Sequence, residues 1–292
     1  MQLLTLCYHV VKDVFYRFLA DDGWAIASHI ALSALMSLFP FLILVTALGG
    51  FLFGSRQLAD PVADILLQAW PTEVATPISG EIRRVLLGAR GDLLTIGVAL
   101  SVYFASSGIE SLRIGLNRAY GVTESRSWWL LRLESIGYVL IGAVGLLSLA
   151  FFIVLAPLII NTAVRYSPTL EPLWSLFNSL RISAAAIVLV VALLIVHKWL
   201  PAGRRSFMTI LPGIAVTLAL WLIAGELFGD YLSRFAYTYV SYYAGLASAM
   251  IALVFLYVIA SIFILGGELN AAIMRWREAQ KAPLETARGA EG

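Results

Sequence analysis

Charged residues are scarce in this chain. Only 13% of its 292 residues are Asp, Glu, Lys or Arg, whereas 60% are hydrophobic, and the mean hydropathy is +0.87. A soluble domain typically carries about 25% charged residues. A single water-soluble core of this size could not bury so much apolar surface. The composition therefore excludes an ordinary soluble domain and predicts a membrane protein.

Cysteine and histidine are nearly absent. The single cysteine, Cys7, excludes an intramolecular disulfide and a cysteine-based zinc site. The three histidines (His9, His29 and His197) are too widely spaced for a metal motif. The motifs His-Glu-x-x-His and Gly-x-Ser-x-Gly and a Walker glycine loop do not occur. We therefore predict no cofactor, no metal and no catalytic residues, and we do not expect an enzyme.

Two further classes are disfavoured by the distribution of charge. The net charge of +2 is too small to suggest a nucleic-acid partner. Near the N-terminus, Lys12, Asp13 and Arg17 are scattered among apolar positions. A signal peptide would instead have a basic segment followed by an apolar block, so we expect none that is cleaved.

Long apolar stretches are what the chain does contain. A helix needs roughly 20 mostly apolar residues to cross the hydrocarbon layer, and lipid offers no partner to loose backbone groups. Six stretches qualify, at 24–53, 93–112, 136–160, 179–200, 207–228 and 244–265. The expected fold is therefore all-α, a polytopic bundle of six transmembrane helices. The uncharged core of the fourth stretch, 182–196, is short, and its failure to span would move the C-terminus to the other side.

The basic residues predict the orientation. They are dense in the short segments before the first span and after the second, fourth and sixth: Lys12, Arg17, Arg113, Arg118, Arg126, Arg132, Lys198, Arg204, Arg205, Arg275, Arg277, Lys281 and Arg288. Fewer lie on the opposite side, spread over a long connection. Cytoplasmic segments carry the excess of Lys and Arg. Both termini are therefore expected on the cytoplasmic side.

The segments outside the spans have recognisable patterns. Apolar residues at helical spacing predict an interfacial cytoplasmic helix over 1–23 and two short amphipathic helices in the outer connection, 54–92. The transmembrane domain then covers 24–274. The composition of 275–292 predicts a disordered cytoplasmic tail.

Ionisable residues lie close to the ends of the predicted spans. Such groups are costly within a membrane and are candidates for function. Glu110 could simply pair with Arg113, one helical turn away, and His29 could be a hydrogen-bonded packing residue between helices. Glu268 follows a pair of glycines and could bind a cation at the interface. The functional alternative is a gate at the cytoplasmic mouth of one pathway, with His29 as a further candidate and a cluster of Glu110, Arg113, Asn117, Glu268 and Asn270.

Prolines and small polar residues suggest a bundle that changes shape. Pro40, Pro157 and Pro212 each remove a backbone hydrogen bond from a predicted span, so each should kink or loosen its helix. Serines at depth, such as Ser37 and Ser106, either mark helix contacts or form a polar seam through the bundle.

The segment 231–243 is unusually aromatic. Its aromatic residues share a helical face and could form an aromatic belt at headgroup level. They could instead form an outer platform for a lipid headgroup or a sugar, with the arginine attracting an anion. The residues concerned are Tyr231, Arg234, Phe235, Tyr239 and Tyr242.

Four motifs together resemble the YihY/BrkB-type family of bacterial inner-membrane proteins. They are Asp22 followed by Ala-Leu-Ser-Ala-Leu-Met-Ser-Leu-Phe-Pro-Phe at 31–41, Leu-Asn-Arg-Ala-Tyr-Gly-Val-Thr-Glu-Ser-Arg at 116–126, Leu-Pro at 200–201 before Arg204 and Arg205, and Tyr-Ala-Gly-Leu-Ala at 243–247 leading to Leu-Gly-Gly-Glu-Leu-Asn at 265–270. The similarity covers about 15–273. The chain departs from it at 31–33 and 243–245, where relatives have Ala-Tyr-Tyr and Tyr-Gly-Ala.

The resemblance implies a multi-pass protein of the bacterial inner membrane. The family has carried a ribonuclease label and has been associated with serum resistance and envelope lipid transport. With the kinked helices and surface charges, it favours a transporter or flippase-like protein for an amphiphilic or lipid-derived substrate. A non-transporting scaffold for envelope maintenance is the alternative, and a membrane-embedded enzyme is a third. Membrane lipids are the expected partners, nucleic acid is not expected, and a homo-oligomer is left open.

Overall fold

The computed structural model describes residues 2–53, 75, 79–80, 94–150, 164, 171–243 and 246–289. These residues form helices and their connections, with no strand among them. The long helices are α1 (Gln2–Ala20), α2 (Gly23–Phe53), α5 (Leu94–Ala119), α6 (Trp128–Ala150), α8 (Glu171–Trp199), α9 (Phe207–Tyr243) and α10 (Ala247–Gly289). The expected all-α fold is confirmed.

Several helices are suited to crossing a membrane. Among the described residues, four stretches are long and apolar enough: Gly23–Val45, Trp128–Leu149, Phe207–Phe235 and Ala247–Ala279. The stretches expected at 93–112 and 179–200 fall in α5 and α8, and α8 contains a shorter apolar helix, Ala186–Trp199. Membrane-spanning helices are therefore confirmed, whereas six crossings remain a prediction.

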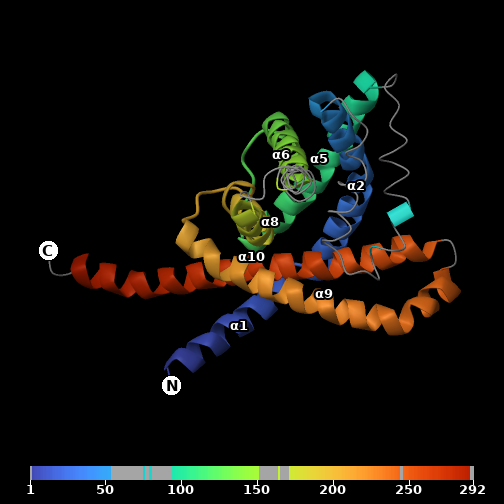
Figure 1. Ribbon diagram of the computed structural model, residues 1–292. Coiled ribbons are helices and arrows are strands. Elements are labelled where there is room, and N and C mark those ends of the chain that lie inside the picture. The colour runs from blue at the N-terminus through green and yellow to red at the C-terminus, as the bar shows by residue number, and fades with distance from the viewer. Residues whose placement is uncertain are drawn as a thin grey trace.

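The helices pack around α10. Helix α9 runs alongside α10, and α2, α5 and α1 also contact α10. In Figure 1, α9 and α10 cross the lower part of the molecule together, α2, α5, α6 and α8 lie above them, and α1 projects below. Helices α2 and α5 pack extensively against each other, α6 packs against both, and α8 contacts α9.

Glycines let α9 and α10 touch at the backbone. A Cβ added at Gly213 would collide with the carbonyl oxygen of Gly266, and one added at Gly266 would collide with the hydroxyl of Thr217. Small residues of this kind permit close helix approach within membranes. The contact fixes the register in which polar side chains of α10 face α9.

Two apolar clusters hold the helices together around the C-terminal end of α5. One unites α5, α8, α9 and α10 through buried residues that include Leu116, Leu200 and Ile210. Another joins α1, α2, α5 and α10 around Phe18 and Ile264. Burying a side chain of this size contributes roughly 1.5–3 kcal/mol. The two clusters position the C-terminal end of α5 against the middle of α10, where Glu268 and Asn270 lie.

The structure corrects the prediction of a disordered C-terminal tail. Helix α10 continues to Gly289, so most of the segment 275–292 is helical. Its Ala, Glu, Lys and Gln residues are good helix formers. Arg275 also holds the start of this extension to α1, because its Nη2 lies 2.9 Å from Oδ2 of Asp13.

The predictions for the N-terminal helix, the prolines and the outer connection have different outcomes. Helix α1 occupies the segment where an interfacial helix was expected, and its apolar Val14 and Phe18 are buried. Helices α2 and α9 run continuously through Pro40 and Pro212. Pro157 and nearly all of the outer connection 54–92 lie outside the described residues.

Candidate functional site

Two connections meet at the end of α5. Oδ1 of Asn117 accepts a hydrogen bond from the backbone N–H of Ala202 at 2.7 Å, and its Nδ2 donates to Oε2 of Glu124 at 3.2 Å. Each connection turns at a glycine with positive φ, Gly121 (63°) and Gly203 (89°), a conformation that side chains with Cβ rarely adopt. Asn117 thereby joins segment 120–127 to segment 200–206.

An ion-pair network stiffens the first connection. Arg126 lies 2.7 Å from Oε2 of Glu124 and 2.7 Å from Oε2 of Glu134 on α6, and it donates to the carbonyl of Leu200 at 3.0 Å. The hydrogen bonds from Arg126 lower the pKa of Glu124 to about 2, against the opposing effect of partial burial. The charge of Arg126 is therefore neutralised within this network.

A chain of buried neutral groups links three more helices to the same place. Nδ2 of Asn270 on α10 donates to the hydroxyl of Tyr120 at 3.2 Å, and this hydroxyl lies 3.0 Å from Nδ1 of His197 on α8. Oδ1 of Asn270 accepts from the backbone N–H of Gly213 on α9 at 2.7 Å. His197 and Asn270 are fully buried. These hydrogen bonds connect the residue after α5, the C-terminal end of α8, the first turns of α9 and the middle of α10.

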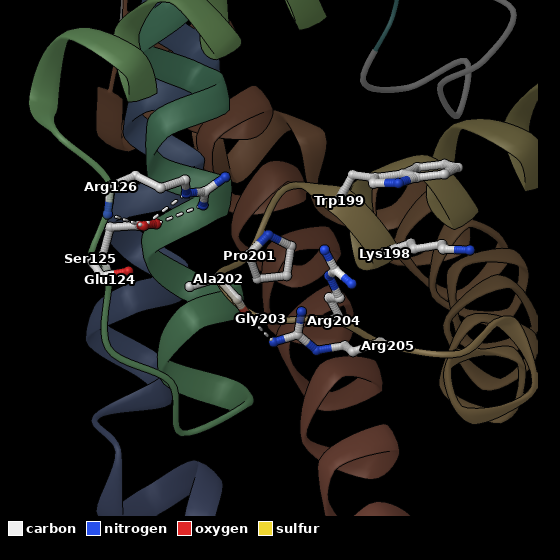
Figure 2. A pocket seen from close by; sticks show the side chains of 10 residues that line it. All are labelled: Glu124, Ser125, Arg126, Lys198, Trp199, Pro201, Ala202, Gly203, Arg204 and Arg205. Carbon is white, nitrogen blue, oxygen red and sulfur yellow. Dashed lines mark hydrogen bonds and ion pairs between the residues drawn. The ribbon is translucent and has the colours of Figure 1, made fainter.

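A pocket of about 530 Å³ opens between the two connections. Figure 2 shows Arg126 and Glu124 on one side, the turn 201–203 with Arg204 and Arg205 in the centre, and Trp199 and Lys198 on α8. Nζ of Lys198 lies 3.2 Å from the centre of the Phe207 ring. The lining is basic and aromatic, and it comprises Glu124, Ser125, Arg126, Lys198, Trp199, Pro201, Ala202, Gly203, Arg204 and Arg205.

Arg205 is the buried cation of this pocket. Only 8% of Arg205 is exposed, and its guanidinium carbon lies 4.0 Å from the centre of the Tyr120 ring. Nη2 donates to the carbonyl of Ala202 at 2.7 Å. Within the described part of the chain, its Nε and Nη1 have no hydrogen-bond partner, and no carboxylate forms an ion pair with it.

Glu110 has a different partner from the expected one. Its Oε2 lies 2.6 Å from Nη1 of Arg132 on α6, whereas Arg113 donates to Ser135 and, at 2.9 Å, to the carbonyl of Leu131. The predicted pairing of Glu110 with Arg113 is therefore wrong. The packing of α6 on α5 places Arg132 beside Glu110. The guanidinium carbon of Arg132 also lies 3.7 Å from the centre of the Tyr103 ring.

Glu268 is buried without a hydrogen-bond partner among the described residues. Only 1% of the residue is exposed, and neither carboxylate oxygen has a partner there. The surrounding charges belong to α1, the α1–α2 turn and α10 itself, namely Asp13, Arg17, Asp21 and Arg275. Asn117 and Asn270 thus belong to two hydrogen-bonded groups that both adjoin the segment 120–127, whereas Glu110 and Glu268 have separate surroundings.

The remaining candidates lie elsewhere. His29 is exposed on α2, so its expected role in packing between helices is wrong. On α9, Tyr231 and Phe235 have ring centroids 5.1 Å apart and Tyr242 is 81% exposed. Arg234 is already paired with Asp230 at 3.0 Å, and the side chain of Tyr239 lies outside the described residues. Recognition at this outer platform stays a prediction.

Sequence reasoning missed the residues at the centre of the site. Tyr120 lies in the family motif at 116–126 but was not singled out, His197 carries no motif, and Arg205 served only for the orientation and the Leu-Pro and Arg-Arg pattern at 200–205. That basic pair after a glycine turn was the available signal. Across the described residues, no group of three or more His, Cys, Asp or Glu could hold a metal ion.

The fold and this site define a class of protein. The chain is an all-α membrane protein whose apolar helices meet at one end in a buried polar network beside a basic pocket. It belongs to the virulence factor BrkB family, whose model matches residues 14–290. The resemblance seen in the sequence is thereby confirmed.

A curated relative covers nearly the same length. The ribonuclease-like protein YfkH of Bacillus subtilis (strain 168) is 27% identical over 263 residues, which is 90% of this chain and 94% of the relative. No solved structure matches the chain.

Proposed function

We propose that this chain is a transporter or flippase-like protein that moves an amphiphilic, lipid-derived substrate across the bacterial inner membrane. The observation that carries the proposal is the pocket at the inner end of the bundle. It combines cationic side chains with an exposed aromatic surface, since Trp199 is 51% exposed beside Arg204 and Arg205. An amphiphile with an anionic head needs both kinds of contact.

The helices around the pocket are joined in a way that suits rearrangement. Asn270, Tyr120 and His197 connect α10, α5 and α8 through neutral hydrogen bonds. Hydrogen bonds of this kind contribute about 0.5–1.5 kcal/mol each, so they can be exchanged as helices shift. Pro40 and Pro212 also remove one backbone hydrogen bond each from α2 and α9.

The proposed topology has six crossings and cytoplasmic termini. The basic connections 120–127 and 200–206 then lie on the cytoplasmic side, following the positive-inside rule. The pocket would receive its substrate from the inner leaflet or the cytoplasm. The apolar exposed faces of α6 and α9 would contact lipid.

Flux across a bilayer tests the proposal directly. The purified full chain is reconstituted into liposomes that contain a fluorescent phosphatidylglycerol, and the label is quenched by an impermeant reductant. Faster loss of protected label than in protein-free liposomes, or in liposomes with an unrelated helical membrane protein, is expected. A folded protein that gives no acceleration with any anionic lipid would favour a non-transporting scaffold.

The name of the Bacillus relative points to ribonuclease activity, which is the second candidate. We expect the purified chain not to cleave RNA, with or without Mg²⁺, because the described residues hold no cluster of metal ligands. Cleavage that disappears in Glu110→Gln or Glu268→Gln would overturn this and place a nuclease site on the cytoplasmic face. A contaminant would cleave equally in all three preparations.

A further inference from the structure

We propose that the pocket between segments 120–127 and 200–206 binds a phosphate group, with Arg205 as its buried contact and Arg204 as its exposed contact. The inference names the head of the substrate and in that respect rests on the proposed function. Binding itself can be measured without transport.

The buried guanidinium of Arg205 requires an anion. A guanidinium stays protonated in proteins, and burying a cation without a counter-ion is strongly unfavourable. Only its Nη2 is satisfied, by the carbonyl of Ala202, and its Nε and Nη1 are buried without a hydrogen-bond partner among the described residues. Stacking on Tyr120 offsets part of this cost, but it supplies no acceptor for those two donors.

No acidic group in the pocket is free to be that counter-ion. Glu124, the acidic residue of the lining, accepts hydrogen bonds from Arg126 at 2.7 and 2.8 Å. Burial raises the pKa of Tyr120 to about 12, so its hydroxyl is neutral near pH 7. Among the described residues, Arg204 and Arg205 therefore line the pocket without a carboxylate partner.

The shape of the pocket favours phosphate. A guanidinium group presents forked donors that match phosphate oxygens, and Figure 2 shows the side chains of Arg204 and Arg205 leaving the chain beside the same turn. That turn contains Gly203, where an added Cβ would meet nothing closer than Arg205 Nη2 at 4.0 Å. A volume of about 530 Å³ leaves room for a phosphate with an attached group. The phosphate could belong to a lipid headgroup or be free in the cytoplasm.

Calorimetric titration of the full chain in detergent tests the inference. The probes are a soluble short-chain phosphatidic acid, inorganic phosphate and acetate. We expect phosphate-bearing probes to bind and acetate not to bind. Arg205→Gln should weaken binding at least about tenfold, because it removes a buried charged donor, and Arg204→Gln should weaken it severalfold. The control Arg277→Gln removes an exposed cation of α10 that does not line the pocket, and it should bind like the wild type.

The variants keep the inference falsifiable. Arg205→Gln can fail to fold because the side chain is buried, but Arg204 is exposed, so Arg204→Gln carries the same test. Phosphatidic acid that binds at least tenfold more tightly than phosphate identifies a lipid headgroup, and equal affinities identify free phosphate. Failure of the folded wild type to bind either, equal binding of acetate, or unchanged affinity in Arg204→Gln overturns the inference. Flux without phosphate binding would contradict the phosphate site but not the proposed transport. Phosphate binding without flux would contradict the proposed transport but not the phosphate site.

Discussion

Two glutamates, Glu110 on α5 and Glu268 on α10, differ in their surroundings. Glu110 is paired with Arg132, whereas Glu268 is almost fully buried without a hydrogen-bond partner among the described residues. Removing one member of an ion pair leaves the other charge uncompensated, whereas removing an unpartnered charge leaves nothing behind. The same chemical change should therefore destabilise the protein more at Glu110 than at Glu268.

We expect Glu110→Gln to lower the free energy of unfolding by about 1–3 kcal/mol, because Arg132 loses its acid. Glu268→Gln should cause no loss larger than about 1 kcal/mol, because a neutral amide is less costly to bury than a carboxylate. Thermal unfolding in detergent measures both. A larger loss at Glu268 would show that its carboxylate has a stabilising partner.

A shared gate would show itself as coupling between the two glutamates. The cluster proposed from the sequence predicts that Glu110→Gln and Glu268→Gln each reduce transport and that their effects are strongly non-additive. Separate surroundings predict additive effects, as for distant sites. Flux measured for the two single variants and the double variant decides between these outcomes, with folding checked for each.

Glu124 should make stability depend on acid. Its folded pKa of about 2 lies below the ordinary value of 4.5, so its contribution is complete above about pH 4.5 and is lost as the pH falls towards 2. A shift of this size corresponds to at most about 3 kcal/mol. The stability difference between the wild type and Glu124→Gln should therefore shrink between pH 5 and roughly pH 2–3. A difference that is constant over this range would contradict the ion pair with Arg126.

At the scale of elements, the contact between α9 and α10 depends on Gly213. We expect Gly213→Ala to cost about 1–3 kcal/mol, because the new Cβ would collide with the backbone of Gly266 and lie 2.5 Å from Nδ2 of Asn270. A backbone cannot yield as a flexible side chain does, so the two helices would separate. Unfolding measurements and loss of phosphate binding would both report the change.

Gly225 provides a matched control on the same helix. An added Cβ there meets nothing within 4 Å, and alanine is the better helix former by about 1 kcal/mol. Gly225→Ala should therefore leave stability unchanged or raise it slightly. Equal losses at the two glycines would mean that backbone contact with α10 is not what Gly213 provides.

At the scale of the whole molecule, the open question is topology. In a Cys7→Ser background, cysteines introduced at Ser55 or Thr76 should react with an impermeant thiol reagent added to intact cells. One at Ser125 should react only after the membrane is opened, because positive-inside counting places its connection in the cytoplasm. The reverse pattern would invert the orientation and place the pocket on the outer side.

The sequence by itself determined the class, the helical fold and the family. Partition between water and lipid is a sum over neighbouring residues, so hydropathy finds apolar helices such as Gly23–Val45 without knowing what they contact. The motifs at 116–126 and 265–270 likewise identify the family locally. In the tail from 275, Ala, Glu, Lys and Gln favour a continued helix, whereas Pro283, Gly289 and Gly292 favour disorder, and composition alone does not decide between them.

Only the tertiary structure decided which polar groups meet. The sequence offered Arg113 as the partner of Glu110 and placed Arg132 only on the same side of the membrane, but the packing of α6 on α5 brings Arg132 to Glu110. Tyr120, His197 and Asn270 lie far apart in the chain and meet because one apolar cluster packs α5, α8, α9 and α10 together. A hydrogen bond or ion pair acts over a few ångströms, so it depends on which helix faces are packed together, and that is a property of the whole bundle rather than of any segment.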